Sequence, residues 1–131
     1  MRKIAAIRDC ATENKEDVDA GDQRCLFKLV ADPCINSPSG DTDAGMADCY
    51  RIQGAIWHTL LNDNCKTLLD DLDTEQTAAR AMQRAWVAYR DTTCRFYDDK
   101  IRGTMSNMMH AACDAPETAR RAMLLRFFSG L

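Results

Sequence analysis

Seven cysteines and two histidines are the residues of this 131-residue sequence that could bind a metal or form a catalytic pair. Zinc sites usually contain two cysteines separated by two to four residues. Here successive cysteines lie 15, 9, 15, 16, 29 and 19 positions apart, so the sequence contains no close pair of ligands. We therefore expect no metal site and no other cofactor.

The same residues offer no nucleophile that can be paired with a base. The sequence has no Gly-x-Ser-x-Gly motif, and its one formal cysteine–histidine pair is Cys65 with His58. Residues seven positions apart on a helix are two turns, or about 10.5 Å, apart along the axis. That distance is too long for direct proton transfer, so we expect no catalytic residue and no enzyme activity.

Six of the seven cysteines fit a pattern of stapled helical hairpins. In three candidate pairs a polar or helix-breaking segment lies near the midpoint, and two helices that fold back there bring symmetric positions within about 5.5 Å between Cα atoms. The expected pairs are Cys10–Cys25 around ENKEDVDAG, Cys34–Cys49 around SPSGDTDAG, and Cys94–Cys113 around RGT. Other connectivities of six cysteines stay open, because sequence alone does not select one.

Disulfides persist in oxidising compartments, which predicts a periplasmic or secreted protein. The opening residues MRKIAAIRDC are too short and too polar for the apolar region of a signal peptide. We expect the native export signal to have been removed from this sequence.

Composition indicates one globular domain over residues 1–131, with 46% hydrophobic and 28% charged residues. The net charge of -3 does not favour nucleic-acid binding, and no stretch approaches the roughly 20 apolar residues of a membrane span. The charge is uneven: residues 1–75 carry 15 acidic against 8 basic residues, or -7, and residues 76–131 carry 5 against 9, or +4. The acidic half is a candidate binding surface, or the halves simply attract each other.

Helical periodicity and breakers predict an all-α fold, a small disulfide-stapled bundle of about four to six helices. We expect two helices near residues 3–14 and 21–31, followed by a long helix that is capped by Asp41 or Asp43 and ends near Leu72. The next helix is expected from Thr74 to Gly103. After a short helical turn, the last helix is expected to begin at about Pro116. Asp114 and Glu117 have the spacing of a capping box for that last helix.

Two helical faces are predicted to be buried. One face consists of Tyr50, Trp57, Leu61, Cys65, Leu68 and Leu72. Cys65, the remaining cysteine, is expected to be a buried free thiol or, alternatively, to form a disulfide between molecules. The other lies in and beside the segment QRAWVAYRDTTC: Met82, Trp86, Tyr89, Thr93 and Phe96. On the opposite, solvated side of that helix we expect the i,i+4 ion pairs Asp91–Arg95 and Asp98–Arg102.

The segment QRAWVAYRDTTC, followed after a Gly-Thr by a second cysteine and ETARRAMLLRF, resembles the closing half of the lysozyme inhibitor LprI-like family. This family occurs in exported bacterial proteins and was formerly classed as a domain of unknown function. Upstream, DTDAGMADCY resembles the family's Thr-x-x-x-Met-x-x-Cys segment, and WHTLLNDNC its Trp-Asp-x-x-Leu-Asn-x-x-Tyr segment. The resemblance covers about residues 25–126, with residues 1–24 as an N-terminal helical extension.

The resemblance implies a set of family motif residues with a mainly structural role: Trp57, Leu61, Asn62, Gln83, Trp86, Tyr89, Arg90, Asp91, Thr118 and Arg121. Three departures are His58 in place of Asp, Cys65 in place of Tyr, and RGT in place of a Gly-Gly-Thr turn. They put in doubt any family contact that uses those polar groups.

The function that the resemblance implies is that of an exported envelope protein that binds a lysozyme without covalent chemistry. The alternative is a periplasmic structural or interaction module with another partner. Since lysozymes are commonly cationic, charge complementarity favours the acidic loop with Asp41, Thr42 and Asp43 as the contact surface. The alternative interpretation of the same loop is a plain connection between two helices with a capping aspartate.

Overall fold

The computed structural model describes residues 2–14, 25 and 32–130. Every regular element in these residues is helical: α1 (Arg2–Glu13), α2 (Asp32–Ile35), the 3-10 turn η2 (Pro38–Gly40), α3 (Asp43–Asp71), α4 (Gln76–Lys100) and α5 (Thr104–Ser129). The predicted all-α class is confirmed. The predicted helix at 21–31 lies outside the described residues, apart from Cys25.

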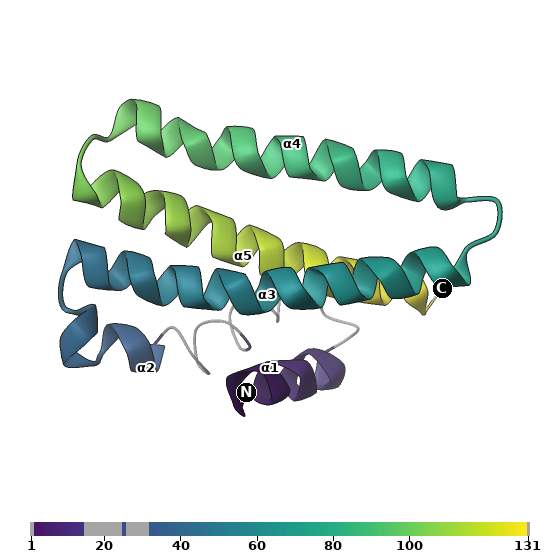
Figure 1. Ribbon diagram of the computed structural model, residues 1–131, viewed down its shortest axis with the longest axis horizontal. Helices are drawn as coiled ribbons and strands as arrows, with labels where there is room; N and C mark the ends of the chain where they lie inside the picture. The colour runs from purple at the N-terminus through teal and green to yellow at the C-terminus, as the bar shows by residue number, and fades with distance from the viewer. Residues whose placement is uncertain (1, 15–24, 26–31, 131) are drawn as a thin grey trace.

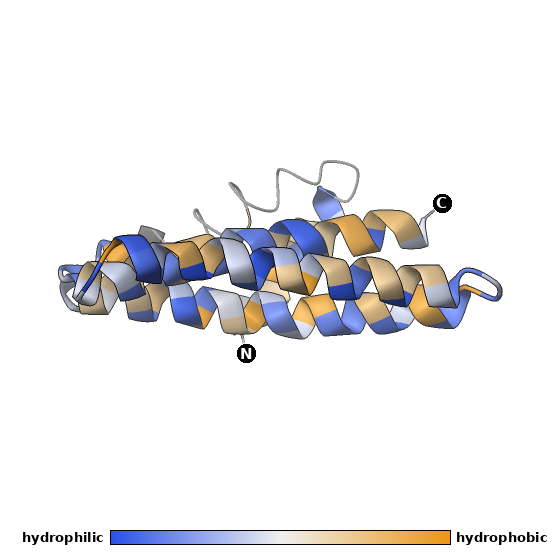
Figure 2. Cartoon of the chain, turned by 90° about the horizontal axis from the view of Figure 1, so that it is seen from above, coloured by the Kyte–Doolittle hydropathy of each residue, from blue (hydrophilic) through white to orange (hydrophobic). Residues whose placement is uncertain are grey.

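The three long helices form the body of the molecule. In Figure 1, α5 lies between α4 and α3, and α1 and α2 lie beyond α3. Seen from above, hydrophobic and hydrophilic residues are interleaved along each long helix (Figure 2). None of the helices in the described part of the chain is both long and apolar enough to cross a membrane.

The core lies mainly where α3 meets α5. The predicted α3 face is confirmed, since Trp57, Leu61 and Leu68 are buried and Tyr50, Cys65 and Leu72 pack against them. The other side of this interface consists largely of small residues, which let the two helix backbones approach closely. The α5 residues in the core are Ala115, Ala119, Ala122, Met123 and Leu125, and α1 adds Ile7 and Ala11.

The structure contains three disulfides, in the pairs that the hairpin pattern predicts. The bonds Cys10–Cys25, Cys34–Cys49 and Cys94–Cys113 have Cα–Cα distances of 5.6, 5.7 and 5.5 Å. In the chain-entropy model, each such loop of 15 to 19 residues stabilises the fold by about 3 kcal/mol. Cys65 is a free cysteine, but it is half-buried rather than fully buried as expected.

The long helix α3 is capped by Thr42, not by Asp41 or Asp43 as predicted. Thr42 has the extended backbone that an N-cap requires, and its Oγ1 accepts a hydrogen bond from the Gly45 N–H at 3.0 Å. Asp43 instead lies in the first turn of α3, where a carboxylate interacts favourably with the helix dipole.

The predicted helix start near Pro116 is wrong, because α5 runs without a break from Thr104 to Ser129. Proline inside a helix removes one backbone hydrogen bond and costs about 3 kcal/mol. Burial of Ala115, Thr118 and Ala119 around it holds the chain in the helix despite that cost. Asp114 is therefore a mid-helix residue and not a cap.

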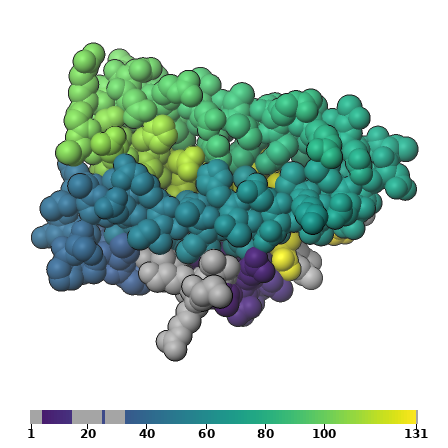
Figure 3. Space-filling model, viewed as in Figure 1, coloured from purple at the N-terminus to yellow at the C-terminus, as the bar shows by residue number. Residues whose placement is uncertain are grey.

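The predicted buried face of α4 is wrong beyond Trp86. The buried residues of α4 are Trp86, Arg90 and Cys94, four positions apart, whereas Tyr89 and Phe96 are 53% and 57% exposed. An arginine thus occupies the centre of the buried stripe, and this moves the aromatic stripe toward solvent. Figure 3 shows α4 along one edge of the molecule, with much of its surface open.

Candidate functional site

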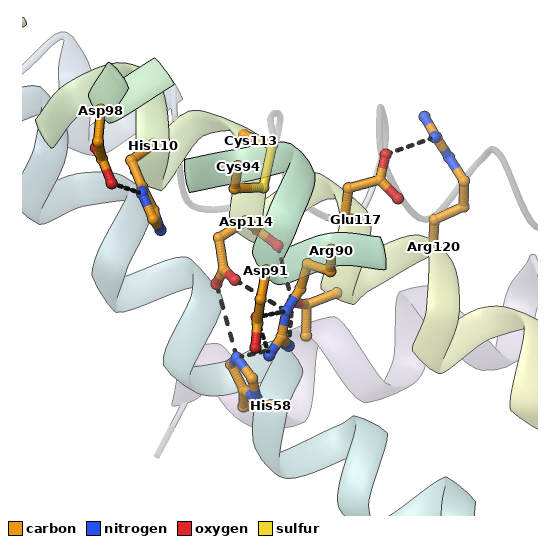
Figure 4. Close-up of a disulfide and its surroundings, with 11 residues drawn as sticks. His58, Arg90, Asp91, Cys94, Asp98, His110, Cys113, Asp114, Glu117 and Arg120 are labelled. Carbon is orange, nitrogen blue, oxygen red and sulfur yellow. Dashed lines mark hydrogen bonds and ion pairs between the residues drawn. A yellow bond between two sulfur atoms is a disulfide. The ribbon is translucent and has the colours of Figure 1, made fainter. Parts of the chain in front are cut away.

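Arg90 is the centre of a polar cluster that joins the three long helices (Figure 4). Its side chain is only 11% exposed. The guanidinium lies 3.0 Å from Asp91 Oδ1, 3.3 Å from Asp114 Oδ1 and 3.3 Å from His58 Nε2. It also donates to Thr118 Oγ1 at 3.5 Å, and Thr118 donates in turn to the Asp114 carbonyl at 2.8 Å.

Trp86 extends this cluster along α4. The Arg90 and Arg121 guanidinium carbons lie 4.8 and 5.6 Å from its ring centroid, which is cation–π distance. Arg121 Nε donates to Gln83 Oε1 at 2.9 Å, and burial lowers the pKa of Arg121 below its ordinary value. The arrangement places two guanidinium groups against one aromatic ring, and the contacts of Arg121 fasten α5 to α4.

His58 and Asp114 link the cluster to α3. The Asp114 Oδ2 to His58 Nε2 distance is 3.6 Å, and interaction with His58 and then with Arg90 lowers the pKa of Asp114. A neutral His58 can accept at Nε2 from Arg90, whereas a protonated His58 donates toward Asp114. The residue at position 58 can therefore hold the three helices together in two different ways.

A second carboxylate–histidine pair lies near the end of α4. Asp98 Oδ2 is 2.9 Å from His110 Nδ1, and Ser106 donates to Asp98 Oδ1 at 3.0 Å. Hydrogen bonds from His110 and then from Ser106 lower the pKa of Asp98. The predicted i,i+4 pairs are not the ones formed: Asp98 pairs with His110 on α5, and Asp91 pairs with its neighbour Arg90.

The structure brings most, but not all, of the predicted family motif residues together. Gln83, Trp86, Arg90, Asp91, Thr118 and Arg121 belong to the cluster, and Trp57 and Leu61 belong to the apolar core. Asn62 and Tyr89 are exposed and lie outside both.

Sequence reasoning missed Asp114 as a member of the cluster. The signal that could have found it is the Cys94–Cys113 bond, which fixes an antiparallel register between α4 and α5. Arg90, one turn before Cys94, then faces the α5 residues that follow Cys113.

Cys65 and His58, the formal catalytic pair, line different grooves. Cys65 lies in a groove between α3 and α4 with Leu69, Val87 and Ala88. His58 lies in another groove, beside Asp114. Within the described residues, no group of three or more His, Cys, Asp or Glu side chains is placed to hold a metal ion.

The acidic loop, residues 36–43, is packed tightly against α2 and the first turn of α3. Ser37 Oγ donates to the Cys34 carbonyl at 2.6 Å, and Gly40 is buried where a Cβ would lie 2.6 Å from Ile35 Cα. A Cβ on Gly45 would collide with the Ser39 carbonyl oxygen. The Cys34–Cys49 bond joins the segments on either side of this loop.

The three predicted contact residues lie at the end of the acidic loop. Asp41 and Thr42 are exposed, and Asp43 is half-buried. Asp48, one turn into α3, has a 70% exposed side chain and pairs with Arg51 at 2.9 Å. The loop therefore presents carboxylates on a rigid support.

Fold and site together define a small, disulfide-stapled helical protein in which a largely buried polar cluster joins the long helices and a tightly packed loop exposes Asp41 and Thr42. A family model described as lysozyme inhibitor LprI matches residues 34–125, which is 92 of the 131 residues. The chain belongs to the LprI lysozyme inhibitor family, as its resemblance predicts. Comparison with curated proteins and with solved structures gave no match.

Proposed function

We propose that this protein inhibits a lysozyme by non-covalent binding in the periplasm or outside the cell. The observation that carries the proposal is the family match, because residues 34–125 include both the acidic loop and the Arg90 cluster. Three disulfides suit an oxidising compartment.

The acidic loop is the proposed contact surface. Asp41, Asp43 and Asp48 carry negative charge on one end of α3, and a cationic lysozyme offers the complementary charge. The Cys34–Cys49 bond, the Thr42 cap and the close contacts of Gly40 and Gly45 fix the loop before binding. A loop that is already ordered loses little conformational entropy when a partner binds.

The Arg90 cluster supports that surface rather than forming it. Arg90 and Trp86 are largely buried; the Arg90 guanidinium is occupied by Asp91 and Asp114, and the Trp86 ring by the guanidinium groups of Arg90 and Arg121. Binding, and not catalysis, is the function that such an arrangement favours. The motif residues would then act by holding α4 and α5 in the bundle to which α3 and its loop are attached.

A peptidoglycan lysis assay tests the proposal. The folded protein in excess should slow lysis by a cationic lysozyme, and the effect should weaken as salt rises from about 0.01 M to about 0.15 M, where the Debye length falls from about 30 Å to about 8 Å. Asp41→Lys should weaken inhibition while leaving helicity unchanged, because Asp41 is exposed and lies outside the helix.

Asp73→Lys is the matched control. It makes the same change in net charge at an exposed position in the α3–α4 connection, at the other end of α3 from the acidic loop (Figure 1). Equal loss of inhibition in both variants would show a general charge effect and reject the loop as the contact. If lysozymes of several classes lyse cells equally fast with and without the protein, inhibition is rejected and an envelope module with another partner takes its place.

A further inference from the structure

The two histidines of the chain lie in one groove, which we call the histidine groove. Its volume is about 970 Å³, and residues from α3, α5 and the end of α4 line it. Its charged and titratable lining includes Arg51, His58, Asp98, Arg102, His110 and Asp114. In Figure 3 the surface is hollowed between α3 and α4, with α5 as the floor.

The two carboxylates of the histidine groove already have partners within the protein. Asp98 accepts hydrogen bonds from His110 and Ser106, and Asp114 faces Arg90 and His58. They offer little to a cationic ligand.

The arginine and amide donors of the histidine groove have fewer partners within the protein than its carboxylates have. Arg102 is exposed and forms no ion pair with any described residue. Arg51 has only the solvent-exposed pair with Asp48, a type of ion pair that contributes little. Asn107 also lines the groove and is exposed. Arginine and amide groups are donors that recognise carboxylate and phosphate oxygens.

Protonation of the histidines would make the groove positive. Its two arginines and two aspartates cancel, so each histidine proton adds a net charge of +1, up to +2. The groups that face His58 are Asp114 from α5 and Arg90 from α4, the latter paired with Asp91. Those near His110 are Asp98 from α4, with Arg95 beyond it, and Asp114. Histidine takes up its proton between about pH 8 and pH 5.

We propose that the histidine groove binds an organic anion, an acidic sugar with a carboxylate or phosphate group, and binds it more tightly at mildly acidic pH. Apolar residues such as Ala55, Ile101 and Ala111 line the groove beside the donors, which suits a ligand with both polar and apolar faces rather than a bare ion. This site is separate from the acidic loop, and it does not depend on lysozyme inhibition.

The test uses three sugars that share one pyranose ring and differ in the group at carbon 6: glucuronate, glucose 6-phosphate and glucose, each added to the folded protein. Isothermal titration should show binding of at least one anion and none of neutral glucose. Glucuronate keeps its charge between pH 5.5 and pH 7.5, whereas a phosphate monoester takes up a proton near pH 6. Glucuronate therefore reports the protein's own titration, and its affinity should rise about tenfold, or about 1.4 kcal/mol, at the lower pH.

Two variants connect binding to the groove. Arg102→Gln should weaken binding at both pH values, and its fold should be unaffected because Arg102 is exposed. His110→Gln should reduce the pH dependence, with thermal melting used to verify that the bundle stays folded. Arg84→Gln is the matched control, because it removes one charge from an exposed site in the other groove.

Binding of only one anion identifies the acidic group that the groove prefers. Absence of binding by both anions, or equal binding of glucose, would overturn the proposal. So would affinities that are the same in Arg102→Gln as in the wild type, or the same at pH 5.5 and pH 7.5 for glucuronate.

Discussion

Helix α5 has two unlike interfaces. On one side, Trp57, Leu60 and Leu61 of α3 pack against the alanines of α5 in a dense apolar contact. On the other side, α4 is attached through one buried tryptophan, a buried arginine and the Cys94–Cys113 bond. The first interface depends on area removed from water and the second on charge, hydrogen bonds and a covalent link.

The difference between the two interfaces explains the structural role of the segment QRAWVAYRDTTC in α4. Helix α4 lies at an edge of the molecule and cannot bury a full apolar face, as the exposure of Tyr89 and Phe96 shows. Gln83 and Arg90 replace that missing burial with directional contacts to α5 and α3, and Asp91 pairs with Arg90 within α4. We infer that α3 and α5 form the more stable part of the bundle and that α4 is the helix that opens first.

The largest expected effect is at the apolar interface. Trp57 is fully buried, so Trp57→Ala should lower the free energy of unfolding by about 3–5 kcal/mol. Chemical denaturation with the disulfides intact measures it. Trp57→Phe is the control: Trp57 Nε1 has no hydrogen-bond partner among the described residues, so this substitution loses no hydrogen bond and leaves a smaller cavity, and its cost should be well below that of Trp57→Ala. A loss below about 1 kcal/mol for Trp57→Ala would contradict the ranking of the two interfaces.

Arg90→Met should produce a smaller loss, confined mainly to α4. The substitution keeps much of the apolar stem but removes hydrogen bonds to charged groups worth about 1.5–3 kcal/mol. It also leaves the half-buried carboxylate of Asp114 with His58 alone. Hydrogen exchange should show faster opening of α4 amides, with α3 amides little changed.

Arg95→Met, at an exposed position on the same helix, provides the comparison for Arg90→Met. Surface substitutions of this kind usually change stability by less than about 0.5 kcal/mol. Uniform acceleration of exchange in α3 and α4 after Arg90→Met would mean that the bundle opens as one unit.

The same comparison shows what sequence could and could not predict. The buried face of α3 could be predicted because α3 packs against the core along its length. Its apolar residues therefore follow the helical period from Tyr50 to Leu72. On α4 the period picked the aromatic stripe through Tyr89 and Phe96, because a hydrophobicity pattern treats Arg90 as a surface residue. The burial of an arginine depends on partners from other helices, here Asp114 and His58, which no local pattern contains.

Local signals were similarly incomplete for the helix ends and for the site. Pro116 and the polar residues around it read as a helix start, and tertiary packing overrides that signal. The three hairpin pairs, by contrast, were predictable because each needs only a chain reversal between two cysteines. The acidic loop was located by composition, but its rigidity depends on Gly40 and Gly45, whose close contacts appear only in three dimensions.

The smallest expected effect is a pH dependence at the far end of the α4–α5 interface. Hydrogen bonds from His110 and Ser106 lower the pKa of Asp98 below its ordinary value of 3.8. A carboxylate whose pKa is lowered by folding stabilises the protein above its unfolded pKa, and this contribution is lost as pH falls through the lower, folded pKa. Asp98→Asn should therefore destabilise the protein near pH 7 and have progressively less effect below about pH 4. The effect should be smaller than that of Arg90→Met, because the Asp98 side chain is 40% exposed.

Denaturation curves at about pH 7, pH 4 and pH 2.5 measure the pH dependence of the Asp98→Asn effect, with Asp99→Asn as the exposed control on the next residue. A destabilisation by Asp98→Asn that stays constant over that range would show that the pair with His110 contributes packing and not charge, and α4 would then be held to α5 by less electrostatic interaction than its contacts imply.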